Sequence, residues 1–110
     1  MTTPYAPTPP YEVERRVRYG ERPGFRITEL QIGPMQEIRW HSHDQAQDTF
    51  YVMKGEIQLS LREPEEELHV RRGAIFAVPP CRPPRVTNGG DDSGTFLVIQ
   101  DGEYDFVPQN

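Results

Sequence analysis

Two histidines and one aspartate stand close together in the segment HSHDQAQDTFYVMKGE, residues 41–56. In an extended strand, residues i and i+2 point to the same face, so His41 and His43 would project together. If the segment DQAQ turns the chain, Asp48 returns beside the two imidazoles. Two imidazoles and one carboxylate with other positions open form a facial triad, which suits Fe(II) and also Mn, Co, Ni or Zn. The alternative is a surface histidine pair that holds no ligand.

The elements that would position these side chains are short strands. Apolar and polar residues alternate at 11–18, 25–32 and 56–61, and shorter strand-like runs follow at 67–70, 74–78 and 95–100. Turn-rich breaks separate them at 19–24, 32–34, 53–56, 62–67, 71–73, 79–84 and 88–94. No window has the periodicity of an amphipathic helix, and the many prolines and glycines suit tight turns. The pattern predicts an all-β sandwich or barrel.

Length, charge and cysteine content narrow the class of protein. A chain of 110 residues is long enough for one domain with one core. Its formal charge of −5 and the lack of a basic cluster argue against a nucleic-acid partner. The single cysteine, Cys81, allows no internal disulfide, so a reducing compartment, the cytoplasm, is expected. Residues 1–10 contain four prolines, which predicts a flexible tail, and residues 11–110 are expected to form the single domain. The sequence shows neither a signal-peptide pattern nor an apolar segment of membrane-spanning length.

The histidine segment resembles the first motif of the cupin family, usually written G-x5-H-x-H-x3,4-E-x6-G. Asp48 stands at the glutamate position, and Gly55 ends the motif at the expected spacing. Gly33 lies two residues further upstream than the first motif glycine. The resemblance covers roughly residues 33–88, because a second motif follows.

That second motif is G-x5-P-x-G-x2-H-x3-N, and Gly73, Pro79 and Asn88 match its spacing. Cys81 replaces the motif glycine, and Pro84 replaces the motif histidine. In the family this histidine completes a four-ligand metal site, whereas proline cannot ligate through its side chain. Three protein ligands can still hold a catalytic metal, although cupins that hold no metal are also known.

The resemblance implies a double-stranded β-helix, a jelly-roll-like barrel of two antiparallel sheets. It implies one divalent transition metal (Fe, Mn, Ni, Co or Zn) on His41, His43 and Asp48. The strand at 11–18 has no obvious place in a single barrel. By resemblance it pairs with a second subunit and covers an exposed edge, so we expect a homodimer.

Three arginines are candidate substrate-binding residues. Arg82 and Arg85 flank Pro84 and could receive a carboxylate or phosphate, or they could be solvated loop charges. Arg39 shares strand parity with His41 and would line the cavity wall, unless it forms a purely structural pair with Glu37.

Other residues have a functional and a structural interpretation. Cys81 lies in a loop that, by resemblance, borders the cavity mouth and could contact metal or substrate, although a small buried packing residue is the favoured interpretation. Phe50 shares parity with Asp48 and should supply part of the apolar wall. His69 is expected on a strand face rather than as the missing ligand, and Asn88 is expected to bond within a turn.

Three functions are compatible with the sequence. The first is a metal-dependent enzyme acting on a small polar or anionic metabolite, of dioxygenase, isomerase, lyase or cyclase type. The second is a metal-poor cupin that binds a small molecule as a sensor or accessory protein without turnover. The third is a metal-independent cyclase, epimerase or dehydratase with His41 or His43 as general base.

Overall fold

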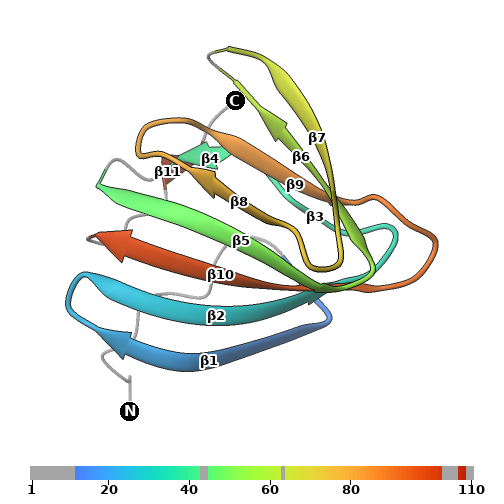
Figure 1. Ribbon diagram of the computed structural model, residues 1–110, viewed down its shortest axis with the longest axis horizontal. Coiled ribbons are helices and arrows are strands. Elements are labelled where there is room, and N and C mark those ends of the chain that lie inside the picture. The colour runs from blue at the N-terminus through green and yellow to red at the C-terminus, as the bar shows by residue number, and fades with distance from the viewer. Residues whose placement is uncertain (1–11, 43–44, 63, 103–106, 109–110) are drawn as a thin grey trace.

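The chain forms two antiparallel sheets that face each other, as the computed structural model shows (Figure 1). The structure describes residues 12–42, 45–62, 64–102 and 107–108, and none of these residues is helical. The described part of the chain therefore contains no helix that could cross a membrane. The strands are β1 (Arg15–Arg22), β2 (Phe25–Ile32), β3 (Glu37–Ile38), β4 (His41–Ser42), β5 (Ala46–Lys54), β6 (Glu56–Leu61), β7 (Glu66–Arg71), β8 (Ile75–Val78), β9 (Pro84–Asn88), β10 (Gly94–Gly102) and β11 (Val107–Pro108).

Strand order shows how the chain winds around the barrel. The five-stranded sheet has the order β1-β2-β10-β5-β8, and the four-stranded sheet has the order β3-β9-β6-β7. A third, two-stranded piece joins β4 to β11. Strands far apart in sequence, such as β2 and β10, are neighbours. This arrangement confirms the predicted all-β double-stranded β-helix with two antiparallel sheets.

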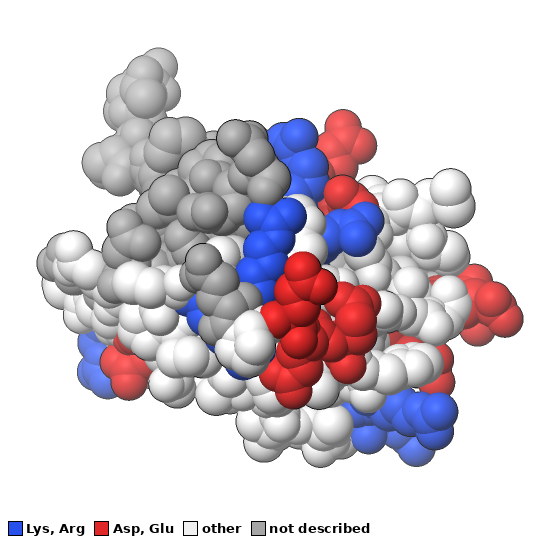
Figure 2. All heavy atoms as spheres, turned by 90° about the horizontal axis from the view of Figure 1, so that it is seen from above, with Lys and Arg blue, Asp and Glu red and all other residues white. Residues whose placement is uncertain are grey.

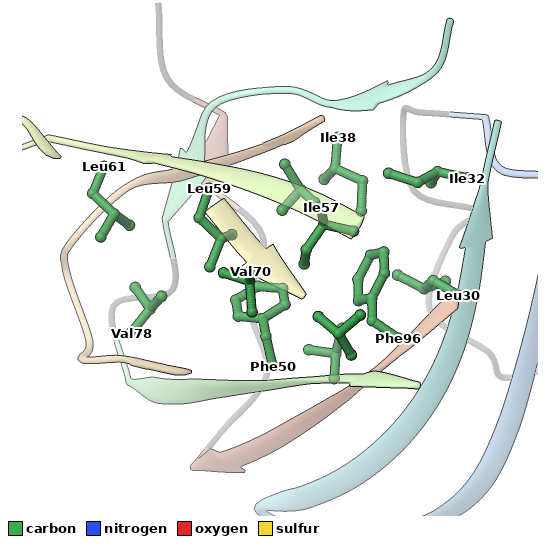
Figure 3. Close-up of a cluster of buried hydrophobic side chains, with 13 residues drawn as sticks. Leu30, Ile32, Ile38, Phe50, Ile57, Leu59, Leu61, Val70, Val78 and Phe96 are labelled. Atoms are coloured by element: carbon green, nitrogen blue, oxygen red, sulfur yellow. The ribbon is translucent and has the colours of Figure 1, made fainter. Parts of the chain in front are cut away.

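The core lies between the two sheets and follows the period-two pattern of the sequence. On β5, Phe50 and Val52 are buried, and on β6 the buried apolar positions are Ile57, Leu59 and Leu61. Figure 3 shows Phe50 of one sheet and Ile57 and Leu59 of the other converging on the same core. The rings of Phe50 and Phe96 lie 5.9 Å apart between centroids and are tilted by 46°, a favourable aromatic geometry.

The N-terminal strand differs from the sequence prediction in its position and its partner. It begins at Arg15 and continues to Arg22, through residues where the sequence predicted a turn. A β-bulge at Tyr19 shifts the register, so the strand stays paired with β2 up to the turn at residues 23–24. The expectation that this strand lacks a place in a single barrel is therefore wrong, because β2 of the same chain pairs with it. The predicted tail at 1–10 lies outside the described residues.

Two further boundaries are corrected by tertiary pairing. Pro84 begins β9 rather than ending the preceding loop, a position where proline is tolerated because it starts the strand. Glu66 begins β7 instead of belonging to the preceding turn, because its pairing with Leu61 of β6 overrides its weak strand propensity.

Candidate functional site

The candidate site lies at one end of the barrel, which we call the mouth. Four segments meet there: Ala46 at the start of β5, Val78 at the end of β8, Gly102 at the end of β10, and the turn at residues 23–24. The Gly102 amide donates a hydrogen bond of 2.7 Å to the Gly24 carbonyl, which ties β10 to the β1–β2 turn. The same strand ends lie at the left of Figure 1.

Asp48 is a buried carboxylate on the inward face of β5. Its exposed fraction is 3%, and it shares its face with Phe50. Its neighbours across the sheet are Gln100 and Val78. The Gln100 amide nitrogen Nε2 donates a hydrogen bond of 3.0 Å to Asp48 Oδ1. Burial of a carboxylate is unfavourable unless hydrogen bonds or a cation stabilise the charge, so this arrangement requires a reason.

Gln100 is a site residue that the sequence analysis missed. It is 7% exposed and lies on the inward face of β10, where Phe96 and Val98 hold the preceding inward positions. The signal was present in the sequence, because in the apolar run TFLVIQ the glutamine takes the next position on the strand face that carries Phe96 and Val98. A polar side chain on a core-facing position needs a hydrogen-bond partner, and Asp48 supplies it.

The two histidines are only partly within the described residues. The backbone of His41 belongs to β4, which pairs with β11 through Pro108 and contacts β9. The side chain of His41 and the whole of His43 lie outside what the structure describes. Within the described ranges, no three side chains among His, Cys, Asp and Glu form a metal-binding cluster. The triad of His41, His43 and Asp48 therefore stays a prediction.

The chemistry of the described part of the site fits a metal ion. A buried carboxylate oriented by a neutral amide is a typical arrangement for a ligand held in place by a neighbouring hydrogen bond. Together with imidazole ligands it would form the N/O donor set that divalent transition metals accept.

Pro84 occupies the position of the family's fourth ligand and faces the interior. Its side chain is fully buried, with an exposed fraction below 2%, and its partner across the sheet is the buried Leu61. Val86, two residues later, is buried on the same face. The chain therefore places an apolar ring where the cupin motif has an imidazole.

Arg85 and Arg39 are placed away from the interior. Arg85 alternates with the buried Pro84 and so lies on the outer face of the four-stranded sheet, where its guanidinium forms an ion pair with Glu37. Arg39 is exposed, and Glu37 pairs with Arg85 instead of forming the Arg39–Glu37 pair considered from the sequence. For Arg39, this placement corrects the expectation of a position on the cavity wall, and for Arg85 it favours a surface charge over a substrate-binding group.

Arg82 lies in the loop between β8 and β9 and contacts the loop between β6 and β7. Its guanidinium donates to the carbonyls of Arg62 and Pro64 at 3.2 and 3.0 Å, and forms an ion pair of 2.9 Å with Glu66. These contacts give Arg82 a structural role in joining two loops. They favour the structural interpretation over substrate binding.

Acidic and basic side chains also lie side by side on the surface seen in Figure 2.

Cys81 is exposed, so its expected role as a small buried packing residue is wrong. Its backbone has φ of 67°, in the left-handed region, and among the described residues it is the only non-glycine residue with positive φ. This backbone geometry explains why the family motif has glycine at this position.

His69 and Asn88 have the structural roles expected from the sequence. His69 lies on β7, with its Nε2 at 3.0 Å from a carboxylate oxygen of Glu56. Asn88 donates to the carbonyls of Ile32 and Asp92 at 3.0 and 2.8 Å, and its Oδ1 accepts from the Gly90 amide at 2.7 Å. Asn88 therefore fastens the β9–β10 loop to the end of β2.

Comparison with known families decides the classification. A model of the cupin domain family matches residues 28–100, which is more than half of the chain. This chain is a cupin. The match confirms the resemblance inferred from the two motifs. No match was found among curated proteins.

Solved structures of other cupin-like proteins share the fold. A protein with a double-stranded β-helix domain from Klebsiella pneumoniae is 22% identical with a TM-score of 0.76, over 87% of this chain and 84% of that chain. Oxalate oxidase in complex with glycolate is 21% identical with a TM-score of 0.71, over 77% of this chain and 46% of that chain. The oxalate decarboxylase formate complex from Lactobacillus farciminis is 16% identical with a TM-score of 0.71, over 78% of this chain and 27% of that chain. This cupin thus spans under half the length of the last two, and at these identities the likeness concerns the fold alone.

Proposed function

We propose that this cupin is a metal-dependent enzyme that acts on a small polar or anionic metabolite. His41, His43 and Asp48 would hold one divalent transition metal, which would supply Lewis-acid chemistry at an oxygen of the substrate. The observation that carries the proposal is the burial of Asp48, at the motif position for a ligand, on a strand face that it shares with the apolar core residues Phe50 and Val52. The cytoplasm stays its expected location.

The residues around Asp48 would prepare the site for this chemistry. Gln100 donates a hydrogen bond to Asp48 Oδ1, which limits the rotation of the carboxylate and orients it as a ligand. Phe50 and Val78 are buried beside Asp48 and provide apolar surface that excludes water and strengthens electrostatic interactions.

The activities of two structurally similar proteins support an anionic metabolite. One is an oxalate oxidase in complex with glycolate, and the other is an oxalate decarboxylase in complex with formate. All three are small carboxylates. The shared fold makes this substrate class a reasonable starting point for assays, although fold alone does not determine chemistry.

Elemental analysis of protein purified without chelator tests the proposal. The wild type should contain close to one transition metal per chain after reconstitution, and both His41→Ala and Asp48→Asn should lose it. Asp48→Asn is the cleaner variant, because asparagine can still accept the hydrogen bond from Gln100 while the negative charge is removed. Equal metal content in wild type and both variants would show that the site is elsewhere.

A second candidate function is supported by Pro84. An apolar ring at the fourth-ligand position suits a metal-poor cupin that binds a small molecule without turnover. Metal-free wild-type protein that still binds a small carboxylate, with no product formed during prolonged incubation, would favour this function over the enzyme.

A homodimer is also part of the proposal. Among the described strands, β1 has a neighbour on one side only, so its second edge could pair with another copy. Its sequence RRVRYGER contains four arginines, which would repel those of a second β1. Light scattering at micromolar concentration should therefore report a dimer that becomes more stable as salt screens this repulsion. A monomeric mass at every salt concentration would contradict it.

A further inference from the structure

An arginine-rich pocket lies at the mouth of the barrel, outside the set of residues singled out from the sequence. Its volume is about 480 Å³, within the range of small-molecule pockets. It is formed by the β1–β2 turn and the end of β10, and its lining residues are Glu21, Arg22, Pro23, Gly24, Phe25, Arg26 and Gly102.

Arg26 is the charged residue of this pocket with the least exposed side chain. That side chain is 11% exposed, and its NH2 group donates a hydrogen bond of 2.5 Å to Glu21. Glu21 is far more exposed, at 49%, and also accepts a bond of 3.0 Å from Arg18. The β-bulge at Tyr19 brings Arg18 and Glu21 onto the same face of β1, so one carboxylate lies between two guanidinium groups.

The pocket has an excess of positive charge. Among the described lining residues, Arg22 and Arg26 are basic and Glu21 is the one acid. Arg18 adds a third guanidinium, because it forms an ion pair with Glu21. The hydrogen bond from Arg26 is the main reason that the pKa of Glu21 is lowered, which shows a cationic environment. A planar guanidinium fork recognises a carboxylate through two parallel hydrogen bonds.

The sheet register connects this pocket with the candidate metal site. Arg26 is the partner of Gln100 across β2 and β10, and Gln100 is the partner of Asp48 across β10 and β5. The three residues therefore occupy one row on the inward face of the sheet. Neighbouring strands are spaced by about 4.8 Å, so the Cα atoms of Arg26 and Asp48 are about 10 Å apart. Arg26 lines the pocket, and a substrate that reaches from it to a metal at Asp48 would have to span this distance.

We propose that Arg26 recognises a carboxylate group of the substrate, and that this pocket makes the cupin specific for small carboxylic acids. The inference rests on the proposed function, because it assigns the other end of the substrate to the site at Asp48. In the ligand-free protein Glu21 forms an ion pair with the guanidinium of Arg26, so it competes with the incoming carboxylate.

Titration of the full chain with acetate, oxalate, malonate and succinate at constant ionic strength tests this inference. Amide shifts of Gly24, Phe25 and Gly102 are the readout, with chloride as the control anion. At least one carboxylate should give saturable shifts, and Arg26→Gln should weaken its binding at least tenfold. Arg72→Gln is the matched control, because Arg72 is an exposed arginine in the β7–β8 turn. Shifts that do not saturate for any of the four, or wild-type binding by Arg26→Gln, would overturn the inference.

Glu21→Gln provides an independent test with the opposite sign. It removes the competing charge from an exposed position, so the carboxylate should bind several-fold more tightly. Unchanged or weaker binding would contradict the role of Glu21 and Arg26. Metal content separates this inference from the proposed function: Arg26→Gln should retain the metal of the wild type. If the wild type holds no metal but binds carboxylates through Arg26, the metal proposal fails and the carboxylate site stands.

Discussion

Gln100 and Asp48 face each other across β10 and β5, and a 3.0 Å hydrogen bond joins the amide of one to the carboxylate of the other inside the barrel. Both side chains are buried. The pair connects the motif-bearing strand β5 with a strand some fifty residues later in the chain, and it links the candidate metal ligand to the pocket at Arg26.

Replacing Gln100 by methionine should weaken both folding and metal binding. The isosteric change keeps the packing but removes a hydrogen bond from a buried carboxylate, which costs about 1–3 kcal/mol in the free energy of unfolding. Metal affinity should fall about 10–100-fold because the ligand is less well oriented. Urea denaturation and metal titration measure the two effects. Gln31→Met, on the outer face of β2 beside Glu14, should change neither strongly.

Pro84→His should increase metal affinity while making the metal-free protein less stable. The position is fully buried and faces the interior, so an imidazole there could complete the family's ligand set. A tenfold gain in affinity needs only about 1.4 kcal/mol. The larger ring and the loss of proline should together cost the apo protein about 1–3 kcal/mol. Calorimetric titration with Zn²⁺ checks the gain, and Pro83→His, one residue away, should show none. Unchanged affinity in a folded Pro84→His variant would mean that residue 84 faces away from the metal.

Cys81→Gly should stabilise the protein slightly. Left-handed backbone costs a non-glycine residue about 1–2 kcal/mol, and the φ of 67° falls in this region. Glycine also increases the entropy of the unfolded chain by about 0.4–1 kcal/mol, so the net gain should be about 1 kcal/mol or less. Urea midpoints measure it, and Cys81→Ala, which keeps a Cβ, should show no such gain. A less stable glycine variant would show that the thiol contributes more than the strain removes.

Gly102→Ala should disrupt the mouth of the barrel. A Cβ at this position would lie 2.0 Å from the Gln45 carbonyl oxygen and 2.8 Å from the Ala46 Cα, and φ is +123°. Backbone strain and the forced movement of β5 should lower the free energy of unfolding by about 2–3 kcal/mol or more. Thermal denaturation compares this variant with Gly20→Ala, where a Cβ would meet no atom within 4 Å. Similar melting temperatures for the two variants would contradict the clash.

Glu67 should contribute to stability only above acidic pH. Hydrogen bonds from Ser60 and Gln58 lower the pKa of Glu67, with Ser60 the larger cause. Because the folded pKa lies below the unfolded value of about 4.3, the contribution is present above that value and is lost as pH falls through the folded pKa. The difference in urea midpoint between wild type and Glu67→Gln should therefore shrink between pH 5 and pH 3. A difference that is constant with pH would show that the charge of Glu67 is unimportant.

The sequence alone determined the class of fold and the position of the buried carboxylate. Alternation of apolar and polar residues has a period of two, so it assigns Asp48, Phe50 and Val52 to one face whatever the partner strand. The two cupin motifs added the winding of the barrel, which the strand order confirms, and the match to residues 28–100 confirms the family.

Only the tertiary structure decided which strands are neighbours and which arginines reach the mouth. Parity within one strand does not reveal register between strands, so the row of Arg26, Gln100 and Asp48 could not be read from local pattern. Arg85 was a natural candidate by proximity in sequence, yet the alternation of β9 places it on the outer face. The bulge at Tyr19 reverses parity along β1 and brings Glu21 to Arg26. Such a bulge depends on long-range pairing with β2, because it inserts one residue into an otherwise regular ladder.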